Sequence, residues 1–165
     1  MIDLHEVGKG HPSEHMYLQP IYEIVKRANA QNVLEIGSGK FTFSRAILKG
    51  LEETNGLLWT CDPKKETDYT HPQMFFQQIR SNDLRRTWYR NIDVLMIDGD
   101  HRDPQVSQDF ANFIPFVLKP GYVIFHDINI PHGKAVRALW QHLKTTYSVY
   151  LEIDTWPGLG VIEIR

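Results

Sequence analysis

Short, almost continuously apolar runs alternate with helical patterns along this chain, and this alternation restricts its fold more than any other feature. The clearest runs are IDVLMID at residues 92–98 and GYVIFHD at 121–127. A strand that is apolar on both faces has to be covered on both, as it is in a parallel sheet between two layers of helices. The sequence predicts further strands at 32–36, 56–62 and 73–79, and helices at 17–28, 43–51, 104–117 and 133–145.

The last two predicted strands, SVYLEI at 148–153 and GVIEIR at 160–165, have only a turn between them and no helix. They are therefore expected to pair as an antiparallel hairpin at one edge. The predicted fold class is α/β: a doubly wound, mostly parallel seven-stranded sheet with helices on both faces and a C-terminal antiparallel β-hairpin. Residues 1–165 are expected to form a single domain, in which 1–30 are an N-terminal helical extension.

Charge and cysteine content restrict the class of partner. The net charge of −2 gives no electrostatic footprint for nucleic acid or for an anionic membrane. The single cysteine, Cys61, excludes an internal disulfide framework and suits a reducing compartment. No apolar run approaches the roughly 20 residues that span a bilayer, and the N-terminal stretch has no apolar core like that of a signal peptide. We expect a cytoplasmic protein with a small-molecule partner.

Polar residues gather where the predicted strands end. In a doubly wound sheet, ligands bind outside the carboxyl ends of the strands, near the point where the strand order reverses. Five of the predicted strands deliver polar groups to this one rim: Glu35 with the glycines that follow it, Asp62, Ser81 with Asn82, the run Asp98 to His101, and His126 with Asp127.

The first rim segment, Gly37–Ser38–Gly39, leaves backbone amides bare and reachable, because glycine has no side chain to cover them. Asp62 ends the second strand, where an acidic side chain can accept hydrogen bonds from the two adjacent hydroxyls of a ribose. These two features indicate a cofactor that contains a nucleoside.

The details of the glycine segment favour one kind of nucleoside. A nicotinamide site uses G-x-G-x-x-G with a pyrophosphate at a helix N-terminus, but Lys40, Phe41 and Thr42 follow here and the third glycine is absent. Glu35 also places a negative charge near the site, which suits a cation better than a pyrophosphate. S-adenosylmethionine carries an amino group and a sulfonium.

The chain resembles class I S-adenosylmethionine-dependent methyltransferases from about Leu18 to Arg165. The motifs that carry the resemblance are VLEIGSGKFTFS, WTCDP, IRSND, DVLMIDGDHRDPQVSQDF and LKPGYVIFHDI, in this order and followed by a terminal hairpin. The IDGDH motif and the acidic Asp109 in the next helix are most similar to a branch of small-molecule O-methyltransferases. Where the family often has a third glycine, this chain has Phe41.

The resemblance implies a role for each residue of the cofactor site. It assigns the methionine end to Glu35 and to the amides around Gly37, Ser38 and Gly39, and the ribose to Asp62. The adenine edge falls to Arg80 or Ser81, and Asp98 lies close to the methionine amino group.

Methyl transfer to an oxygen needs the hydroxyl deprotonated as it attacks, and a histidine titrates in the useful range. In the sugar O-methyltransferases that this stretch resembles, a histidine three residues after the aspartate is the base, which makes His101 the candidate here, with Asp98 beside it. The same resemblance implies a divalent metal held by Asp98 and Asp127, with His126 in place of another acidic residue. Two carboxylates with water suit Mg²⁺, whereas a histidine ligand favours a transition metal.

Each of these residues also has a structural interpretation. Asp98 and Asp100 can form an Asx turn with Gly99, which is the favoured interpretation for Asp100. Asp109 is expected to make a local salt bridge, and Trp156 either lines a substrate mouth or packs.

The predicted function is S-adenosylmethionine-dependent O-methylation of a small hydroxylated metabolite or sugar. A catalytically idle module that binds the cofactor, an NAD-dependent oxidoreductase and a nucleic-acid methyltransferase are the alternatives. Because the chain has no inserted lid, we expect either an open acceptor pocket or a second subunit that closes it, as in a homo-oligomer.

Overall fold

A computed structural model of the chain describes residues 15–131 and 133–165. Its helices are α1 (His15–Arg27), α2 (Thr42–Thr54), α3 (Ser81–Thr87), α4 (Gln105–Phe113) and α5 (Lys134–Thr146), with one 3₁₀ turn, η2 (Ile114–Phe116). Its strands are β1 (Asn32–Ile36), β2 (Leu57–Cys61), β3 (Met74–Gln77), β4 (Ile92–Ile97), β5 (Val117–His126), β6 (Ser148–Ile153) and β7 (Leu159–Ile164). Of the predicted N-terminal extension, α1 lies within this range and residues 1–14 lie outside the described residues.

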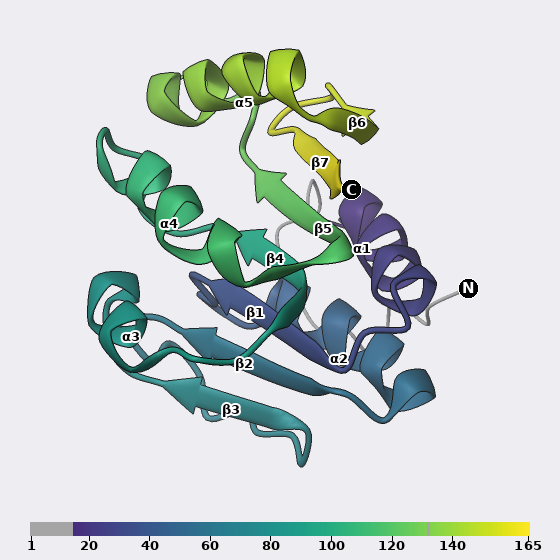
Figure 1. The fold of residues 1–165 in the computed structure, drawn as a ribbon. Coiled ribbons are helices and arrows are strands. Elements are labelled where there is room, and N and C mark those ends of the chain that lie inside the picture. Colours follow the sequence, from purple (N-terminus) through teal and green to yellow (C-terminus); the bar gives the residue numbers. More distant parts are fainter. Residues whose placement is uncertain (1–14, 132) are drawn as a thin grey trace.

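The seven strands form one sheet in the order β3-β2-β1-β4-β5-β7-β6 (Figure 1). Strands β1 to β5 are parallel, and β7 pairs antiparallel with both β5 and β6. The chain runs outward from β1 through β2 to β3 and then returns to the other side of β1 as β4, so the order reverses between β1 and β4. The predicted fold class, with its C-terminal hairpin, is confirmed.

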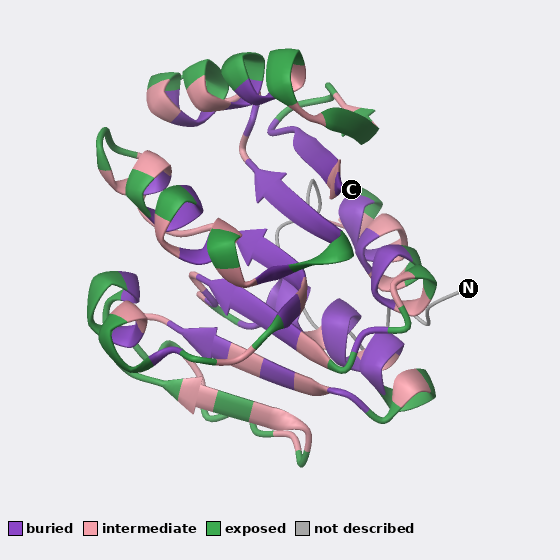
Figure 2. Ribbon diagram, in the orientation of Figure 1, coloured by how far each residue is buried: buried purple, intermediate pink, exposed green. Residues whose placement is uncertain are grey.

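The apolar strands pack on both faces, as their composition predicts. On one face, α1 and α2 cover side chains such as Val94, Met96 and Ile124. On the other, α3, α4 and α5 cover their sequence neighbours, such as Leu95 and Ile97. Figure 2 shows β1, β4 and β5 buried and the edge strands β3 and β6 much less so. The core therefore has two layers with the sheet between them.

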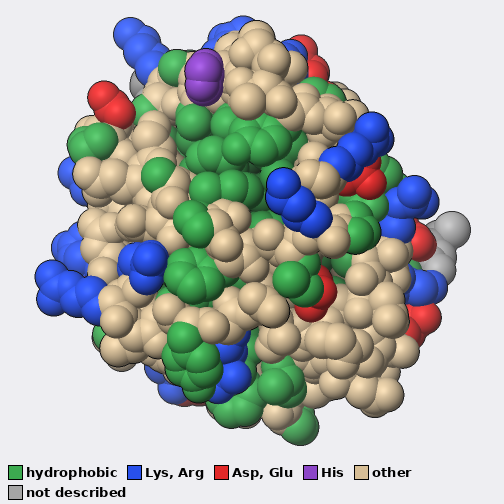
Figure 3. Space-filling model, in the orientation of Figure 1, with side chains coloured by type: hydrophobic (Ala, Val, Ile, Leu, Met, Phe, Trp, Pro, Cys, Tyr) green, Lys and Arg blue, Asp and Glu red, His purple; other side chains and the backbone are tan. Residues whose placement is uncertain are grey.

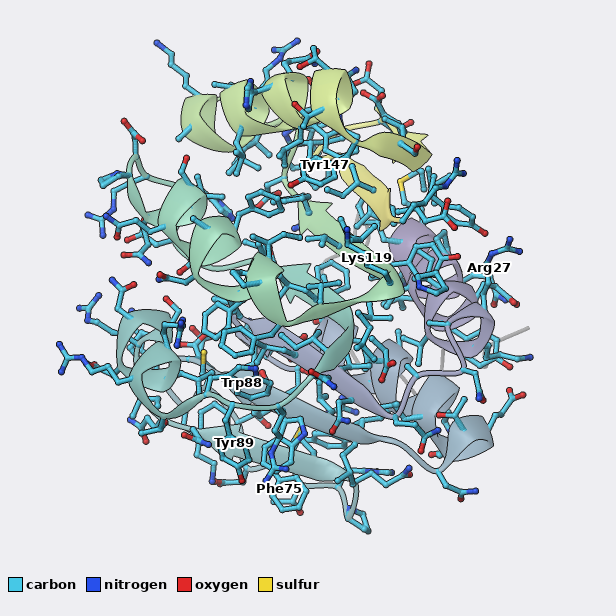
Figure 4. All side chains as sticks on the ribbon, in the orientation of Figure 1. Arg27, Phe75, Trp88, Tyr89, Lys119 and Tyr147 are labelled. Carbon is cyan, nitrogen blue, oxygen red and sulfur yellow. The ribbon has the colours of Figure 1, made fainter. Side chains whose placement is uncertain are left out.

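The edge next to β3 carries exposed aromatic rings. Figure 4 shows Trp88 and Tyr89 near β2 and β3, with Phe75 closer to the lower border of the molecule. Trp88 is buried, while Tyr89 is 75% exposed. The ring of Phe75 stacks on Trp59, with centroids 4.5 Å apart. Phe75 and Tyr89 therefore expose aromatic surface at this edge of the sheet.

Two predicted helix ends are wrong for physical reasons. The helix expected over 104–117 ends at Phe113 and gives way to η2, because Pro115 lacks the amide hydrogen that would continue the α-helical hydrogen bonds. The helix expected to end near Gly50 continues to Thr54, where Asn55 takes a left-handed conformation. Gly50 instead permits close packing of α2 on α1, since a Cβ there would lie 2.7 Å from a methyl carbon of Val25.

Helix α3 was not predicted. It is short, and only Ser81 and Leu84 of its side chains are buried, so it shows no apolar period. None of the helices in the described part of the chain has the length and apolar character needed to cross a membrane.

Candidate active site

A cavity of about 600 Å³ lies at the carboxyl ends of the central strands. It opens beside the point between β1 and β4 where the strand order reverses, which is where ligands bind in such sheets. Most residues predicted for the cofactor site line it: Gly37, Ser38, Gly39, Asp62, Arg80, Ser81 and Asp98. Glu35, His101 and Asp127 do not belong to its wall.

Gly37 brings the ends of β1 and β4 together. Its φ is +86°, and a Cβ there would lie 2.2 Å from the carbonyl oxygen of Asp98, so no other residue fits without a shift. The next residue, Ser38, is buried, and its hydroxyl has no hydrogen-bond partner among the described residues although it lines the cavity. A buried polar atom of this kind fits a polar ligand group.

Phe41 occupies the place of the missing third glycine and keeps a glycine-like backbone. Its φ and ψ are 61° and 29°, in the left-handed region, directly before the first residue of α2. Its ring is 1% exposed and contacts the rings of Tyr69 and Phe76. Burial of the ring holds a conformation that glycine would adopt without strain.

Asp62 fastens the glycine segment to the end of β2. One carboxylate oxygen accepts a hydrogen bond from the backbone amide of Gly39 at 3.1 Å, and the other accepts one from the amide of Lys64 at 2.8 Å. A carboxylate oxygen has two lone pairs, so each can accept one more hydrogen bond. The side chain is half-buried in the cavity wall, and its free acceptor positions suit a pair of hydroxyls.

Glu35 lies behind the cavity. Its carboxyl accepts hydrogen bonds from the hydroxyls of Ser44, at 2.5 Å, and Thr60, at 2.7 Å. Complete burial raises the pKa of this carboxyl to about 7, although the two hydroxyls lower it. Glu35 thus joins β1 to α2 and β2, and its side chain reaches these residues rather than the cavity space.

A second group of side chains, the acid–histidine cluster, shares Asp98 with the cavity and adds His101, His126 and Asp127. Nδ1 of His126 lies 2.9 Å from an oxygen of Asp98 and 3.3 Å from an oxygen of Asp127. Nε2 of His101 lies 3.1 Å from the other oxygen of Asp127 and 3.8 Å from Asp98. The rings of Phe43 and Tyr17 flank His126.

Charge in the acid–histidine cluster is strongly coupled. Burial lowers the pKa of His126, but the carboxylates of Asp98 and Asp127 outweigh it and raise the pKa to about 10. Burial raises the pKa of Asp98, but His126 and His101 outweigh it and hold the pKa below its usual value. Asp98 also raises the pKa of His101, with a further contribution from Asp127, while burial opposes both. At neutral pH, therefore, His126 is an imidazolium beside an ionised Asp98.

The same cluster offers a ligand set for a cation. Ligand atoms of Asp98, His101 and Asp127 all lie within 4.8 Å of one another. The set contains the two aspartates of the predicted metal pair and adds His101, and two carboxylates with one imidazole are a chemically suitable donor set for a divalent metal. The cluster therefore fits a metal, but His126 already contacts both carboxylates.

Sequence reasoning gave Asp109 the wrong partner. We expected a local salt bridge, but Asp109 is 1% exposed, lines the cavity and accepts hydrogen bonds from Ser81 and Gln105. Its position was a usable signal, because Asp109 falls on the apolar face of α4 beside Val106 and Phe110. An acid on a buried helix face needs polar partners.

The structure shows the surroundings of Asp100 and Trp156, the other two residues with a structural interpretation. Asp100 accepts a hydrogen bond from the backbone amide of Arg102 at 3.1 Å, which is an Asx turn, although it includes His101 and Arg102 rather than Gly99. Trp156 is exposed and its neighbour Pro157 is buried, with the Pro157 carbonyl accepting a hydrogen bond from the amide of Asn129. The turn between β6 and β7 is therefore fixed to the segment that follows β5.

The geometry can be compared with solved structures. An O-methyltransferase from Bacillus cereus in complex with SAH has a TM-score of 0.72 at 15% identity, covering 98% of this chain and 90% of that one. TomG, an O-methyltransferase from Streptomyces achromogenes in complex with SAM, has a TM-score of 0.72 at 13% identity, covering 96% and 82%. The methyltransferase MycE, in complex with Mg, SAH and mycinamycin VI, has a TM-score of 0.63 at 18% identity, covering 99% and 55%. At these identities the similarity shows the fold alone.

Comparison by sequence gives the family. No curated protein matches the chain. A family model described as a methyltransferase domain matches residues 34–128, which extend from β1 to the turn after β5 and include the glycine segment, Asp62 and the acid–histidine cluster. Because this match covers more than half of the chain, the protein belongs to that methyltransferase family.

Proposed function

We propose that this protein transfers a methyl group from S-adenosylmethionine to a hydroxyl oxygen of a small acceptor. The observation that carries the proposal is that the cavity and the acid–histidine cluster share one residue, Asp98. A nucleoside site and a set of groups able to take a proton are therefore in direct contact, as methyl transfer to a hydroxyl requires.

Different residues of the cavity wall would bind different parts of the cofactor. The amides around Gly37 and Gly39 and the unpartnered hydroxyl of Ser38 would hold the methionine end, with Asp98 near its amino group. Asp62 would accept hydrogen bonds from the ribose through its remaining lone pairs. S-adenosylmethionine supplies, when bound, a methyl group on a sulfonium that an attacking oxygen can displace. Solved structures of the same fold that contain SAH or SAM support this assignment.

His101 is the proposed base, with Asp98 beside it. The His101 side chain is partly exposed and lies outside the wall of the cofactor cavity. An acceptor hydroxyl gives its proton to the imidazole, and the carboxylates of Asp127 and Asp98 stabilise the imidazolium that forms. Because these carboxylates raise the pKa of His101, the neutral base becomes abundant at a higher pH than it does for an ordinary histidine.

A divalent metal on Asp98 and Asp127 is the second proposal for how the hydroxyl is activated. The ligand cluster supports it, and so does the Mg present with MycE. A metal held by Asp98 and Asp127 alone leaves His101 free to act as the base, whereas a metal that also binds His101 removes it as a base. Turnover that survives chelation of divalent metals but is lost in His101→Gln would favour the base, whereas loss on chelation and rescue by one metal would favour the metal.

The cofactor proposal is tested by calorimetric titration with S-adenosylmethionine and S-adenosylhomocysteine. Asp62→Ala should weaken binding about tenfold or more, because two ribose hydrogen bonds to a charged acceptor are lost. Asp68→Ala is the matched control, since Asp68 is fully exposed and pairs only with Lys65 at the surface. No binding to the wild-type protein, or equal binding by both variants, would contradict the assignment.

The alternatives make different predictions in the same experiments. A catalytically idle module binds S-adenosylhomocysteine but methylates none of a panel of sugars, catechols and hydroxy acids. An NAD-dependent oxidoreductase binds NADH in its place. On the face shown in Figure 3, Lys and Arg side chains lie apart rather than in one continuous field, which favours a small acceptor over nucleic acid.

Location and assembly belong to the same proposal. The buried free thiol of Cys61 suits a reducing, cytoplasmic compartment. With His101 partly exposed, a second copy of the chain would be needed to close the acceptor side. Light scattering coupled to size exclusion tests this, and a monomer with full activity would contradict it.

A further inference from the structure

Three side chains form a connected polar group in the cavity wall, between the start of α3 and the first turns of α4. Ser81, Gln105 and Asp109 all line the cavity. The Ser81 hydroxyl donates to Oδ1 of Asp109 at 2.6 Å, and the Gln105 amide donates to the same Oδ1 at 2.7 Å and to the Ser81 oxygen at 3.2 Å. None of these residues is needed for the acid–histidine cluster, so their arrangement calls for another role.

Counting protons shows what this group offers to a ligand. The one hydroxyl proton of Ser81 is used inside the group, and one amide proton of Gln105 is shared between Oδ1 of Asp109 and the Ser81 oxygen, which lie only 2.6 Å apart. Both donors to the carboxylate meet at Oδ1, so Oδ2 of Asp109 is left without a hydrogen-bond partner among residues 15–131 and 133–165. The carboxylate therefore presents a free acceptor, Oδ2, and a ligand group that donates hydrogen bonds fits it.

The surroundings of this acceptor suit a flat ring. Oδ2 lies beside Gly99, where a Cβ would approach it to 3.7 Å, so the missing side chain leaves access to the oxygen. Ile36, Cys61 and Ile79 supply apolar wall to the same cavity. A heterocycle that carries an amino group combines an apolar face with a hydrogen-bond donor at its edge, which is the complement of this arrangement.

We propose that Asp109 is a specificity residue whose Oδ2 accepts a hydrogen bond from the 6-amino group of adenine, so that the site selects an adenine nucleoside over its 6-oxo counterpart. The proposal rests on the proposed function, because S-adenosylmethionine is the source of the base. Ser81 and Gln105 are positioning residues that hold the carboxylate by its other oxygen. Burial raises the pKa of Asp109, although the hydrogen bonds from Ser81 and Gln105 lower it. A further hydrogen bond donated to Oδ2 by a ligand would also lower the pKa.

The experiment compares two ligands that differ at position 6 of the base and at the adjacent N1, which carries a proton in the 6-oxo form. S-adenosylhomocysteine and S-inosylhomocysteine, in which an oxo group replaces the 6-amino group, are titrated calorimetrically into the full chain. The wild-type protein should prefer the adenine ligand by about 10-fold to 100-fold, because the oxo group is itself an acceptor and leaves Oδ2 of Asp109 unpaired.

Asp109→Asn gives a prediction of opposite sign. Ser81 and Gln105 both donate to the Oδ1 position, so they hold the amide oxygen there and direct the amide nitrogen to the Oδ2 position. The variant then offers a donor where the wild-type protein offers an acceptor, and the preference should shift toward S-inosylhomocysteine. Asp83→Asn is the matched control, since Asp83 lies on α3 outside the cavity wall and faces Arg86, and it should keep the wild-type ratio.

The outcomes separate this inference from the proposed function. If the wild-type protein binds neither ligand, the proposed function fails and the inference with it. If it binds both equally, or if a folded Asp109→Asn keeps the wild-type ratio, only the inference is overturned. If Asp109→Asn lowers the affinity for both ligands by the same factor, Oδ2 acts on a part that the two ligands share and the assignment to the 6-amino group is wrong. Should Asp109→Asn not fold, the wild-type ratio alone still decides between preference and no preference.

Discussion

Replacing Phe41 by alanine and by glycine separates the two opposing effects that meet at this residue. Phe41 combines a buried ring with a backbone φ of 61°. Both substitutions remove the same ring and its contacts with Tyr69 and Phe76. They differ in the backbone, because alanine keeps a Cβ in the left-handed region and glycine does not.

The magnitudes follow from these two terms. Removing a buried phenylalanine side chain destabilises a protein by about 3–5 kcal/mol. A Cβ in the left-handed region costs roughly 1–2 kcal/mol, and the greater freedom of glycine in the unfolded chain returns about 0.4–1 kcal/mol of this difference. The Phe41→Gly variant should therefore be more stable than Phe41→Ala by about 1 kcal/mol, although both are less stable than the wild type.

Urea unfolding followed by circular dichroism measures the difference. Ala46→Gly is the matched control, because Ala46 lies inside α2, where glycine is less stable than alanine by about 0.5–1 kcal/mol. The glycine–alanine difference should have opposite signs at positions 41 and 46. If glycine is the less stable of the two at both positions, the left-handed backbone at Phe41 carries no strain and the argument fails.

Three further predictions concern single groups. Glu35 has a pKa of about 7 in the fold against 4.5 for an ordinary glutamate, so its burial destabilises the fold increasingly as the pH rises from 4.5 through 7. Between pH 4.5 and 8 the free energy of unfolding of the wild-type protein, measured in urea, should fall by roughly 3 kcal/mol relative to that of Glu35→Gln. Parallel pH curves for the two proteins would show that Glu35 does not titrate. Tyr17→Phe leaves the amide of Gly158 without its acceptor and should cost about 1–3 kcal/mol in the same assay, whereas an unchanged midpoint would contradict the contact. Gly37→Ala should destabilise the protein by more than about 2 kcal/mol, because the new Cβ meets the carbonyl of Asp98. Gly39→Ala has open space at its Cβ and should lose only about 1 kcal/mol of stability to backbone strain. Equal losses at the two glycines would refute the close approach at Gly37.

The apolar strands could be predicted from sequence because burial on both faces leaves a direct mark on composition. The run at 92–98 and the hairpin at 148–165 are where they were expected. Helix α3 left no such mark, since tertiary contacts of a few residues rather than an apolar period determine it. The early start of β5 at Val117 depends on its pairing with Ile92, which is a contact between distant residues.

The candidate site divides in the same way. Residues at strand ends could be named, since topology alone brings Gly37, Asp62 and Asp98 to one rim. What their side chains contact could not, because it depends on rotamers and on neighbours from other elements. The position of His126 between two carboxylates and the burial of Asp109 are such cases.

The hydroxyl of Tyr17 has a consequence for how the protein is made. It donates to the carbonyl of Thr155 and accepts from the amide of Gly158, so it joins α1 to the turn before β7 across 141 positions of sequence. At the usual rate of translation, roughly 10–30 s separate the synthesis of these two partners. During that interval α1 has no hairpin to bind, and the face of the sheet that it covers stays incomplete, however early β1 to β4 come together.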